Sequence, residues 1–362
     1  MNTLNIIAVT VTIPLLMPPG LATAGTSCGS WSNNQYGRKL QPSAALVEYF
    51  TESDAGPNDP RCSGHTCSLW GWLYTPDPYY NCPPIARAGD IGDVSPCFIF
   101  NRHPAIVFNH GHALEREEPC AIADFFTRDG YVVFAPLRRG NRDATTGKQN
   151  TGVYIDQCVV PGSTPGKEAD ELPKDQILET ACLADQVKEV DAALKYLTRP
   201  SAAVDPARIA LMGHSFGGSL TVYAAASALS THPKAAIDIS GASLDWNDNV
   251  WYRQPVPPGL PFAVTQRRMP IFFLQPSNEA NLEPTIQLSS AAGHSGDHMM
   301  QAAFYPPVVP DSSECPAKIT DLCDGPGVLV NKKVHGRFVT RTEHVQAWGP
   351  AALDFLKRYN VH

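Results

Sequence analysis

Charge is scarce in this chain, and the charge that is present is mainly acidic. Asp, Glu, Lys and Arg together make up 17% of the 362 residues, and the formal net charge is −7. No segment stands out as basic, which argues against a nucleic-acid partner. Internal repeats and low-complexity tracts are also lacking. Because 43% of the residues are hydrophobic, the chain can bury a sizeable core, and we expect one large domain rather than two.

The sequence also lacks a hydrophobic run long enough to span a bilayer. The most apolar run, from Ile6 to Met17, has about 12 residues, whereas a transmembrane helix needs about 20. Ala22-Thr23-Ala24 then forms an A-x-A cleavage site, so the pattern predicts a signal peptide at residues 1–24 and a secreted or periplasmic mature chain from 25 to 362. No basic residue precedes the run, since the first is Arg38. A buried N-terminal strand is therefore the alternative.

Cysteine is absent before the predicted cleavage site, and all ten cysteines follow it. An even number of cysteines in an exported chain favours disulfide bonds, although spacing alone does not give their pairing. A zinc site at Cys62, Cys67 and His65 is the alternative, but no second C-x-x-C or H-x-H pair lies nearby. We therefore expect neither a metal nor an organic cofactor. The ten positions are Cys28, Cys62, Cys67, Cys82, Cys97, Cys120, Cys158, Cys182, Cys315 and Cys323.

The segment Arg208–Gly218 carries the strongest functional signal. Four apolar residues, Ile209 to Met212, lead into G-H-S-F-G with Ser215 at its centre, and small residues follow. A serine on a sharp turn from strand to helix projects its oxygen from the top of a sheet, and flanking glycines let neighbouring backbone pass close to it. The pattern predicts a nucleophile elbow. A glycine-rich turn with Ser215 as a helix cap is the alternative.

Apolar runs and helical patterns alternate along most of the chain. This rhythm is typical of βαβ units, which form a parallel sheet with helices on its faces. Strands are predicted at 47–51, 67–74, 104–109, 131–137, 209–212, 235–239, 270–274 and 300–305. Helices are predicted at 121–128, 183–200, 217–230, 283–292 and 347–359.

Three segments interrupt this rhythm and are interpreted as loop insertions. They lie near 78–102, 141–174 and 306–332 and are rich in Pro, Gly or Cys. The segment 141–174 is long enough for a lid above the elbow, with a disordered loop as the alternative. Trp246 and Trp251 lie in the loop-rich stretch 241–268. They are candidates for the substrate cleft, although ordinary packing also explains them.

A serine nucleophile needs a base, and the base needs an orienting acid. On this type of sheet the chain order is nucleophile, acid, histidine. Glu279 is the first choice for the acid, because it follows the predicted strand 270–274. Asp238, Asp245 and Asp248 remain alternatives in or after the preceding strand.

For the base we expect His335, which we place in a loop before the last helix, with His344 as the alternative. His294 and His298 precede the last predicted strand and are candidates for lining the cleft. The oxyanion hole is assigned to the backbone N–H of Phe216 and to that of His112 or its immediate neighbour. His110 and His112 alone are a weak metal signal.

Together these segments resemble the α/β-hydrolase superfamily and, within it, the dienelactone-hydrolase-like esterases. The resemblance covers roughly residues 47–360, broken by the insertions. The elbow region is its most specific part, and Glu279 departs from it, because the family usually carries Asp at this position. The matching motifs are Leu69–Pro76, Val107–Gly111, Pro136–Gly140, Val204–Gly218, and His335–Phe338 with Trp348–Pro350.

The resemblance implies an α/β-hydrolase fold, with a mostly parallel central sheet flanked by helices. It implies a serine hydrolase that cleaves a small-molecule or polymer-borne carboxylic ester through an acyl-enzyme, and the predicted signal peptide makes this a secreted or periplasmic enzyme. A serine peptidase or amidase on the same fold is the closest alternative. A non-catalytic binding protein would need a missing triad member, and a transferase would use an alcohol in place of water.

Overall fold

A computed structural model of the chain describes residues 43–50, 69–76, 102–111, 117–138, 179–200, 203–243, 246–247, 253, 255, 259–279, 281–294, 300–305 and 328–362. The predicted signal peptide at 1–24 and the insertion at 141–174 lie outside these residues, as do nearly all of 78–102 and 306–332.

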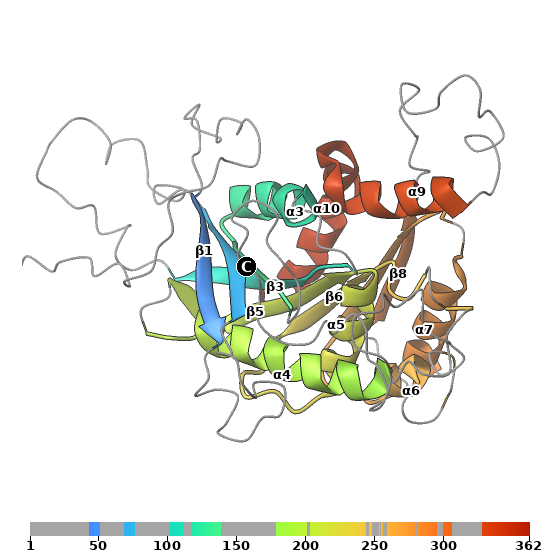
Figure 1. Cartoon of the computed structure of the whole chain (residues 1–362), viewed down its shortest axis with the longest axis horizontal. Coiled ribbons are helices and arrows are strands. Elements are labelled where there is room, and N and C mark those ends of the chain that lie inside the picture. The colour runs from blue at the N-terminus through green and yellow to red at the C-terminus, as the bar shows by residue number, and fades with distance from the viewer. Residues whose placement is uncertain are drawn as a thin grey trace, which may run out of the picture.

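The described strands form one eight-stranded sheet with the order β1-β2-β4-β3-β5-β6-β7-β8 (Figure 1). The pairs β1–β2 and β2–β4 are antiparallel, and every later pair is parallel. The predicted mostly parallel sheet is therefore confirmed. The strands are β1 (Ser43–Phe50), β2 (Leu69–Thr75), β3 (His103–Asn109), β4 (Val132–Pro136), β5 (Val204–His214), β6 (Ala235–Ile239), β7 (Ile271–Pro276) and β8 (Met300–Tyr305).

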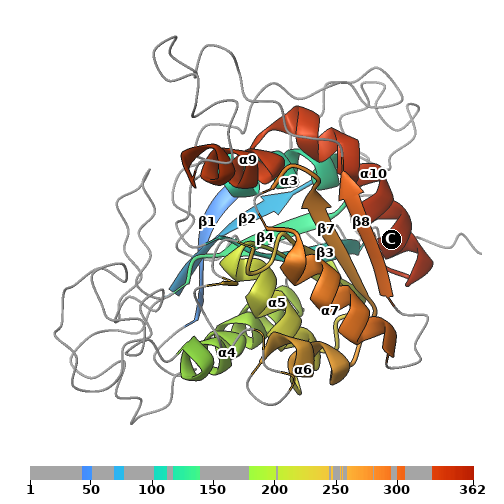
Figure 2. The same ribbon diagram turned by 90° about the vertical axis from the view of Figure 1, so that its right-hand side faces the viewer.

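Helices cover both faces of the sheet (Figure 2). One face carries α3 (Glu117–Arg128), α9 (Val328–Thr340) and α10 (Thr342–Arg358). The other carries α4 (Glu179–Leu197), α5 (Phe216–Ala226), α6 (Leu260–Thr265) and α7 (Glu283–His294). Among the described residues, no helix is both long and apolar enough to cross a membrane.

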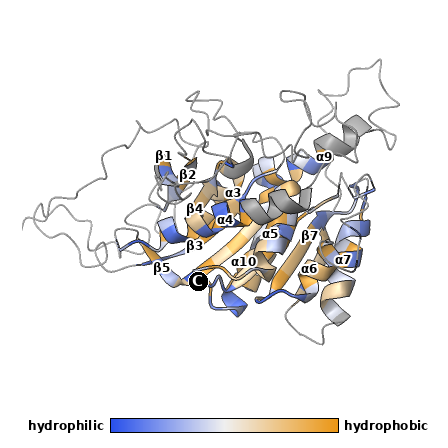
Figure 3. Ribbon diagram, turned by 60° about the horizontal axis from the view of Figure 1, so that its bottom comes forward, coloured by the Kyte–Doolittle hydropathy of each residue, from blue (hydrophilic) through white to orange (hydrophobic). Residues whose placement is uncertain are grey.

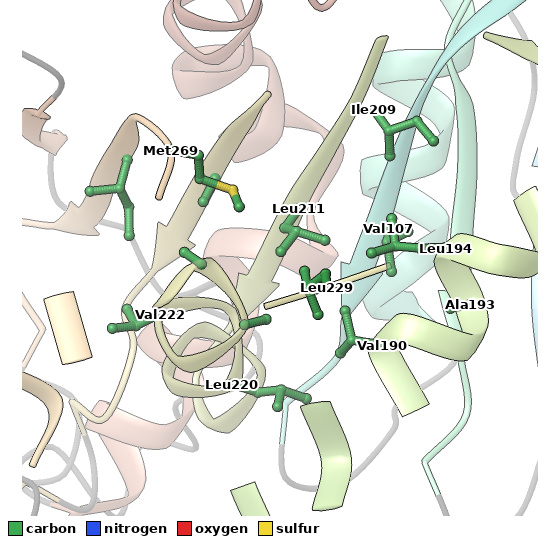
Figure 4. Close-up of a cluster of buried hydrophobic side chains, with 14 of the residues drawn as sticks. Val107, Val190, Ala193, Leu194, Ile209, Leu211, Leu220, Val222, Leu229 and Met269 are labelled. Carbon is green, nitrogen blue, oxygen red and sulfur yellow. The ribbon is translucent and has the colours of Figure 1, made fainter. Parts of the chain in front are cut away.

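The continuous apolar runs of the central strands fill two cores at once. Alternate residues of a strand point to opposite faces of the sheet. On β5, Ile209 and Leu211 pack in one core, whereas Ala210 and Met212 pack in the other. The first core also contains Val190 of α4 and Leu220 of α5 (Figure 4). The central strands are accordingly apolar along most of their length (Figure 3), as expected for strands that helices cover on both faces.

Two helices differ from the sequence prediction. Helix α6 was not predicted within 241–268. It is a short helix of six residues that begins after Gly259 with Pro261 in its first positions, where the missing N–H of proline costs nothing. The expectation that His335 lies in a loop is wrong, because His335 is inside α9. Val334, Phe338 and Val339 form a buried face there and hold the helix against the sheet despite Gly336.

Candidate active site

Ser215 lies at the turn between β5 and α5 in a backbone conformation that residues other than glycine rarely adopt. Its φ is 56° and its ψ is −123°, and such strain persists only where the surrounding structure holds it. The Ser215 N–H donates a hydrogen bond of 2.9 Å to the carbonyl of Ile239, and its carbonyl accepts one of 2.9 Å from Gly218 N–H. The turn is thus fixed to β6 and to the first turn of α5.

The two glycines of the G-x-S-x-G motif are required by close backbone packing. A Cβ added to Gly213 would lie 2.0 Å from the carbonyl oxygen of Gly217. A Cβ added to Gly217 would lie 2.0 Å from the carbonyl oxygen of Asn109, at the end of β3. The Asn109 side-chain amide also donates a hydrogen bond of 2.9 Å to Thr221 Oγ1 on α5. The elbow therefore packs directly against the end of β3.

His335 and Glu279 form a buried pair beside the elbow. Nδ1 of His335 lies 2.5 Å from Oε1 of Glu279, and the two side chains are 6% and 0% exposed. Glu279 is in the turn that follows β7, and His335 is on α9. The His335 ring also packs on the ring of His214, the residue before Ser215, with ring centroids 4.4 Å apart. The structure thus brings the predicted acid and the predicted base together next to Ser215.

Electrostatics distinguishes Glu279 from Asp238, the alternative acid on β6. Burial works against ionisation of Glu279, but the charge and hydrogen bond of His335 and the hydroxyls of Ser243 and Ser240 hold its pKa below the usual value. Burial raises the pKa of Asp238 to about 7, and the nearby charge of Glu279 adds to that rise. Only an ionised acid stabilises an imidazolium ion. This difference favours Glu279 for that role.

The other predicted residues are placed as follows. His344 is in the first turn of α10, where burial lowers its pKa and its charged neighbours are Glu343, Arg337 and Arg341. Trp246 is fully buried in the core shared with α5, so its predicted alternative, ordinary packing, is confirmed. Outside the described residues or side chains lie His112, Asp245, Asp248, Trp251, His294 and His298.

Arg138 was not predicted as a site residue, yet it joins both sides of the expected oxyanion hole. Its guanidinium donates hydrogen bonds of 2.5 Å to the carbonyls of His110 and Gly111, in the loop after β3. The same guanidinium lies 5.0 Å from the centroid of the Phe216 ring. The Pro136–Gly140 motif indicates this region, but no local pattern indicates which groups the guanidinium binds. Buried Arg138 therefore fixes the loop relative to the first residue of α5.

Replacing Arg138 with methionine is expected to lower kcat about 10- to 100-fold with a smaller effect on KM, because a misplaced oxyanion donor loses transition-state stabilisation. Steady-state kinetics on an ester checks this. Arg128→Met is the matched control, since Arg128 pairs with Asp124 on α3, away from the elbow. An unchanged kcat in folded Arg138→Met would contradict the role given to Arg138.

The model of the acetyl xylan esterase (AXE1) family matches residues 94–241, a range that holds the elbow and amounts to less than half of the chain. The chain has the α/β-hydrolase fold. A search of curated proteins found no match.

Solved structures similar to this chain include esterases and a peptidase. The ferulic acid esterase from Streptomyces cinnamoneus has a TM-score of 0.49 and 18% identity, over 88% of this chain and 89% of that one. The acetyl xylan esterase from Paenibacillus sp. R4 has a TM-score of 0.48 and 15% identity, over 88% and 84%. The Pyrococcus horikoshii acylaminoacyl peptidase has a TM-score of 0.47 and 15% identity, over 89% of this chain but 42% of the peptidase. The chain thus spans about two-fifths of that peptidase.

Proposed function

We propose that the chain is a secreted or periplasmic serine hydrolase that cleaves carboxylic esters through an acyl-enzyme. The observation that carries this proposal is the arrangement of Ser215 on its strained turn beside the buried His335–Glu279 pair. Such a triad is recognised by geometry and roles on any fold. Export is supported by Cys120, which is disulfide-bonded. The other nine cysteines are at positions whose side chains are not described.

The contacts of His335 support a separate role for each of its two ring nitrogens. Because Nδ1 faces the carboxylate of Glu279, it carries a proton, and Nε2 is left to take the proton of the Ser215 hydroxyl. The serine oxygen then attacks the ester carbonyl carbon and forms a tetrahedral intermediate. When that intermediate collapses, the alcohol leaves with the proton from Nε2. Water repeats the sequence on the acyl-enzyme and releases the carboxylic acid.

The negative oxygen of the tetrahedral intermediate needs donors that are already in place. The N–H of Phe216, at the start of α5, is one proposed donor, and the helix terminus adds its positive dipole end. The second is proposed to come from the loop after Asn109, where His112 is the sequence-based choice. Each such donor contributes on the order of 100- to 1000-fold in rate.

One finding guides the choice of substrate. The matching family model describes acetyl xylan esterases, which favours esters over amides and short acyl groups over long ones. An acetyl group carried on a polysaccharide is therefore the substrate class to test first. A peptidase or amidase is the second candidate, because an acyl-enzyme triad also cleaves amides.

A panel of p-nitrophenyl esters with two to eight acyl carbons, together with peptide p-nitroanilides and acetylated xylan, distinguishes these candidates. We expect turnover of esters, with the highest kcat/KM for the acetyl ester, and release of acetate from the polymer. Anilide turnover without a preference for esters would replace the esterase assignment with the peptidase one. Ser215→Ala serves as the blank throughout.

A further inference from the structure

The turn that follows β6 is strained and fully buried. Ser240 and Ala242 have φ angles of 53° and 59°, a region that residues other than glycine seldom occupy. Ser240, Ala242 and Ser243 are only 1%, 2% and 3% exposed. The Ser240 N–H donates a hydrogen bond of 2.8 Å to the carbonyl of Leu274 on the neighbouring strand β7. Strain of this kind persists where the structure over-determines it, and often has a functional purpose.

Both serine hydroxyls of this turn bind the carboxylate of Glu279. Ser240 Oγ donates a hydrogen bond of 2.7 Å to Oε2, and Ser243 Oγ donates one to Oε1. Ser243 Oγ also lies 3.2 Å from Nδ1 of His335. Glu279 therefore receives three donors, from the two serines and the imidazole, and both of its oxygens are used.

The hydrogen bonds from the two serines fix the position and the charge of the Glu279 carboxylate. Glutamate has one more rotatable bond than aspartate, so its carboxylate is harder to fix, and a buried carboxylate that lacks donors is driven to the neutral form. Gly241 in this turn packs closely on Asp238, because an added Cβ would lie 2.3 Å from a carboxyl oxygen of Asp238. The strained turn thus sets the two hydroxyls at fixed positions against β7.

We propose that Ser240 and Ser243 are positioning residues that keep Glu279 ionised and directed at Nδ1 of His335, an inference that rests on the proposed function. In this role both serines act through Glu279, and Ser243 also lies close to Nδ1 of His335. The catalytic machinery then extends from the elbow to the turn after β6.

The proposal predicts the direction of a pH effect. The groups around Glu279 are His335, which favours its charged form, and Asp238, whose carboxyl lies within reach of its charge. The ring of His214 packs on the ring of His335. The active form has a neutral imidazole and an ionised Glu279. Loss of the two hydroxyl donors destabilises this active form more than it destabilises the form in which the His335–Glu279 pair holds one more proton. The apparent pKa of the pair therefore rises. Activity is then lost earlier as the pH falls.

The test compares the pH profile of kcat/KM in wild type, S240A, S243A and the double variant S240A/S243A. We expect the acid limb of the double variant to move up by about one pH unit or more, since a hydrogen bond to a charged group commonly has that effect. Plateau kcat should fall about tenfold with KM little changed. Ser219→Ala is the control, because Ser219 is a fully buried serine on α5 whose hydroxyl has no described contact with Glu279. Its acid limb should stay in place.

Two outcomes separate the inference from the proposed function. If ester hydrolysis depends on Ser215 but the acid limb of the folded double variant matches wild type, the positioning role is wrong and the hydrolase proposal stands. If wild type shows no Ser215-dependent hydrolysis, the proposed function fails, and NMR of the His335 Nδ1–H proton then tests the positioning role by itself. The pH at which this proton signal changes should be higher in S243A than in wild type. S243A is used because it leaves the strained Ser240 intact. An unchanged midpoint would overturn the inference.

Discussion

Replacing Ser215 with alanine is expected to lower kcat/KM for the preferred ester by at least about 10⁴-fold, because the substitution removes the oxygen that becomes acylated. What remains should reflect only binding and the oxyanion hole. Substrate binding should persist, since the alanine leaves the rest of the site in place. Initial rates on the acetyl ester, together with a binding titration of the intact ester to the variant, measure both effects.

A second substitution at the same position separates chemistry from folding. Ser215→Gly should be as inactive as Ser215→Ala but more stable, because glycine accepts a φ of 56° without strain. Strain at such a position costs about 1–3 kcal/mol, so removing it should raise the free energy of unfolding. The larger backbone entropy of glycine in the unfolded chain offsets part of this increase. Thermal unfolding of both variants provides the comparison. Retained esterase activity in either variant would remove Ser215 from the mechanism.

Replacing Glu279 with glutamine is expected to lower kcat by about 10⁴-fold, the size of effect produced by the wrong imidazole tautomer in a serine triad. The amide also brings an NH₂ group into a position where Ser240, Ser243 and His335 all approach as donors. At one of the two former oxygen positions, the new NH₂ group then faces another hydrogen-bond donor, which is unfavourable. Steady-state kinetics over the pH range of wild-type activity measures the loss.

Glu279→Asp and Asp238→Asn are the matched controls for that experiment. Aspartate keeps the charge but is one methylene shorter, so it should retain more activity than glutamine while losing part of its contact with Nδ1. Asp238→Asn should retain most activity, because the pKa of Asp238 is raised to about 7 and its carboxyl does not contact His335 in the described contacts. If Asp238→Asn were as damaging as Glu279→Gln, the acid would be misassigned.

The same carboxylate gives a pH dependence to folding. Because its pKa is lowered in the folded chain, Glu279 contributes stability above the pKa of an unfolded glutamate, and this contribution is lost as the pH falls through the folded value. The Glu279→Gln variant lacks this contribution, so its free energy of unfolding should vary less with pH in the acidic range than that of wild type.

Much of the sheet could be predicted from sequence because its strands are apolar on both faces. The runs at 104–109, 235–239 and 270–274 correspond to β3, β6 and β7 within one or two residues. The elbow was equally visible, because only glycine fits at Gly213 and Gly217. The start of β5 could not be predicted in the same way, because Val204 joins that strand by pairing with His103 rather than by an apolar pattern of its own.

The surroundings of the site were harder to predict, because tertiary contacts create them. Gly336 made a loop around His335 a reasonable expectation, yet packing of Val334 and Phe338 keeps the segment helical. Ser240 and Ser243 are 36 or more residues away from Glu279 in sequence. Serines after a strand carry no local signal of their partner, and the same is true of Arg138.

Covalent labelling tests the central claim most directly. The chain is treated with a fluorophosphonate, a reagent that phosphonylates a serine only where a base activates it, and the modified peptide is identified by mass spectrometry. The account predicts one adduct per chain, on Ser215, formed at a much lower rate in the Glu279→Gln variant and absent in Ser215→Ala. An active chain that carries no adduct, or carries it on another serine, would contradict the account.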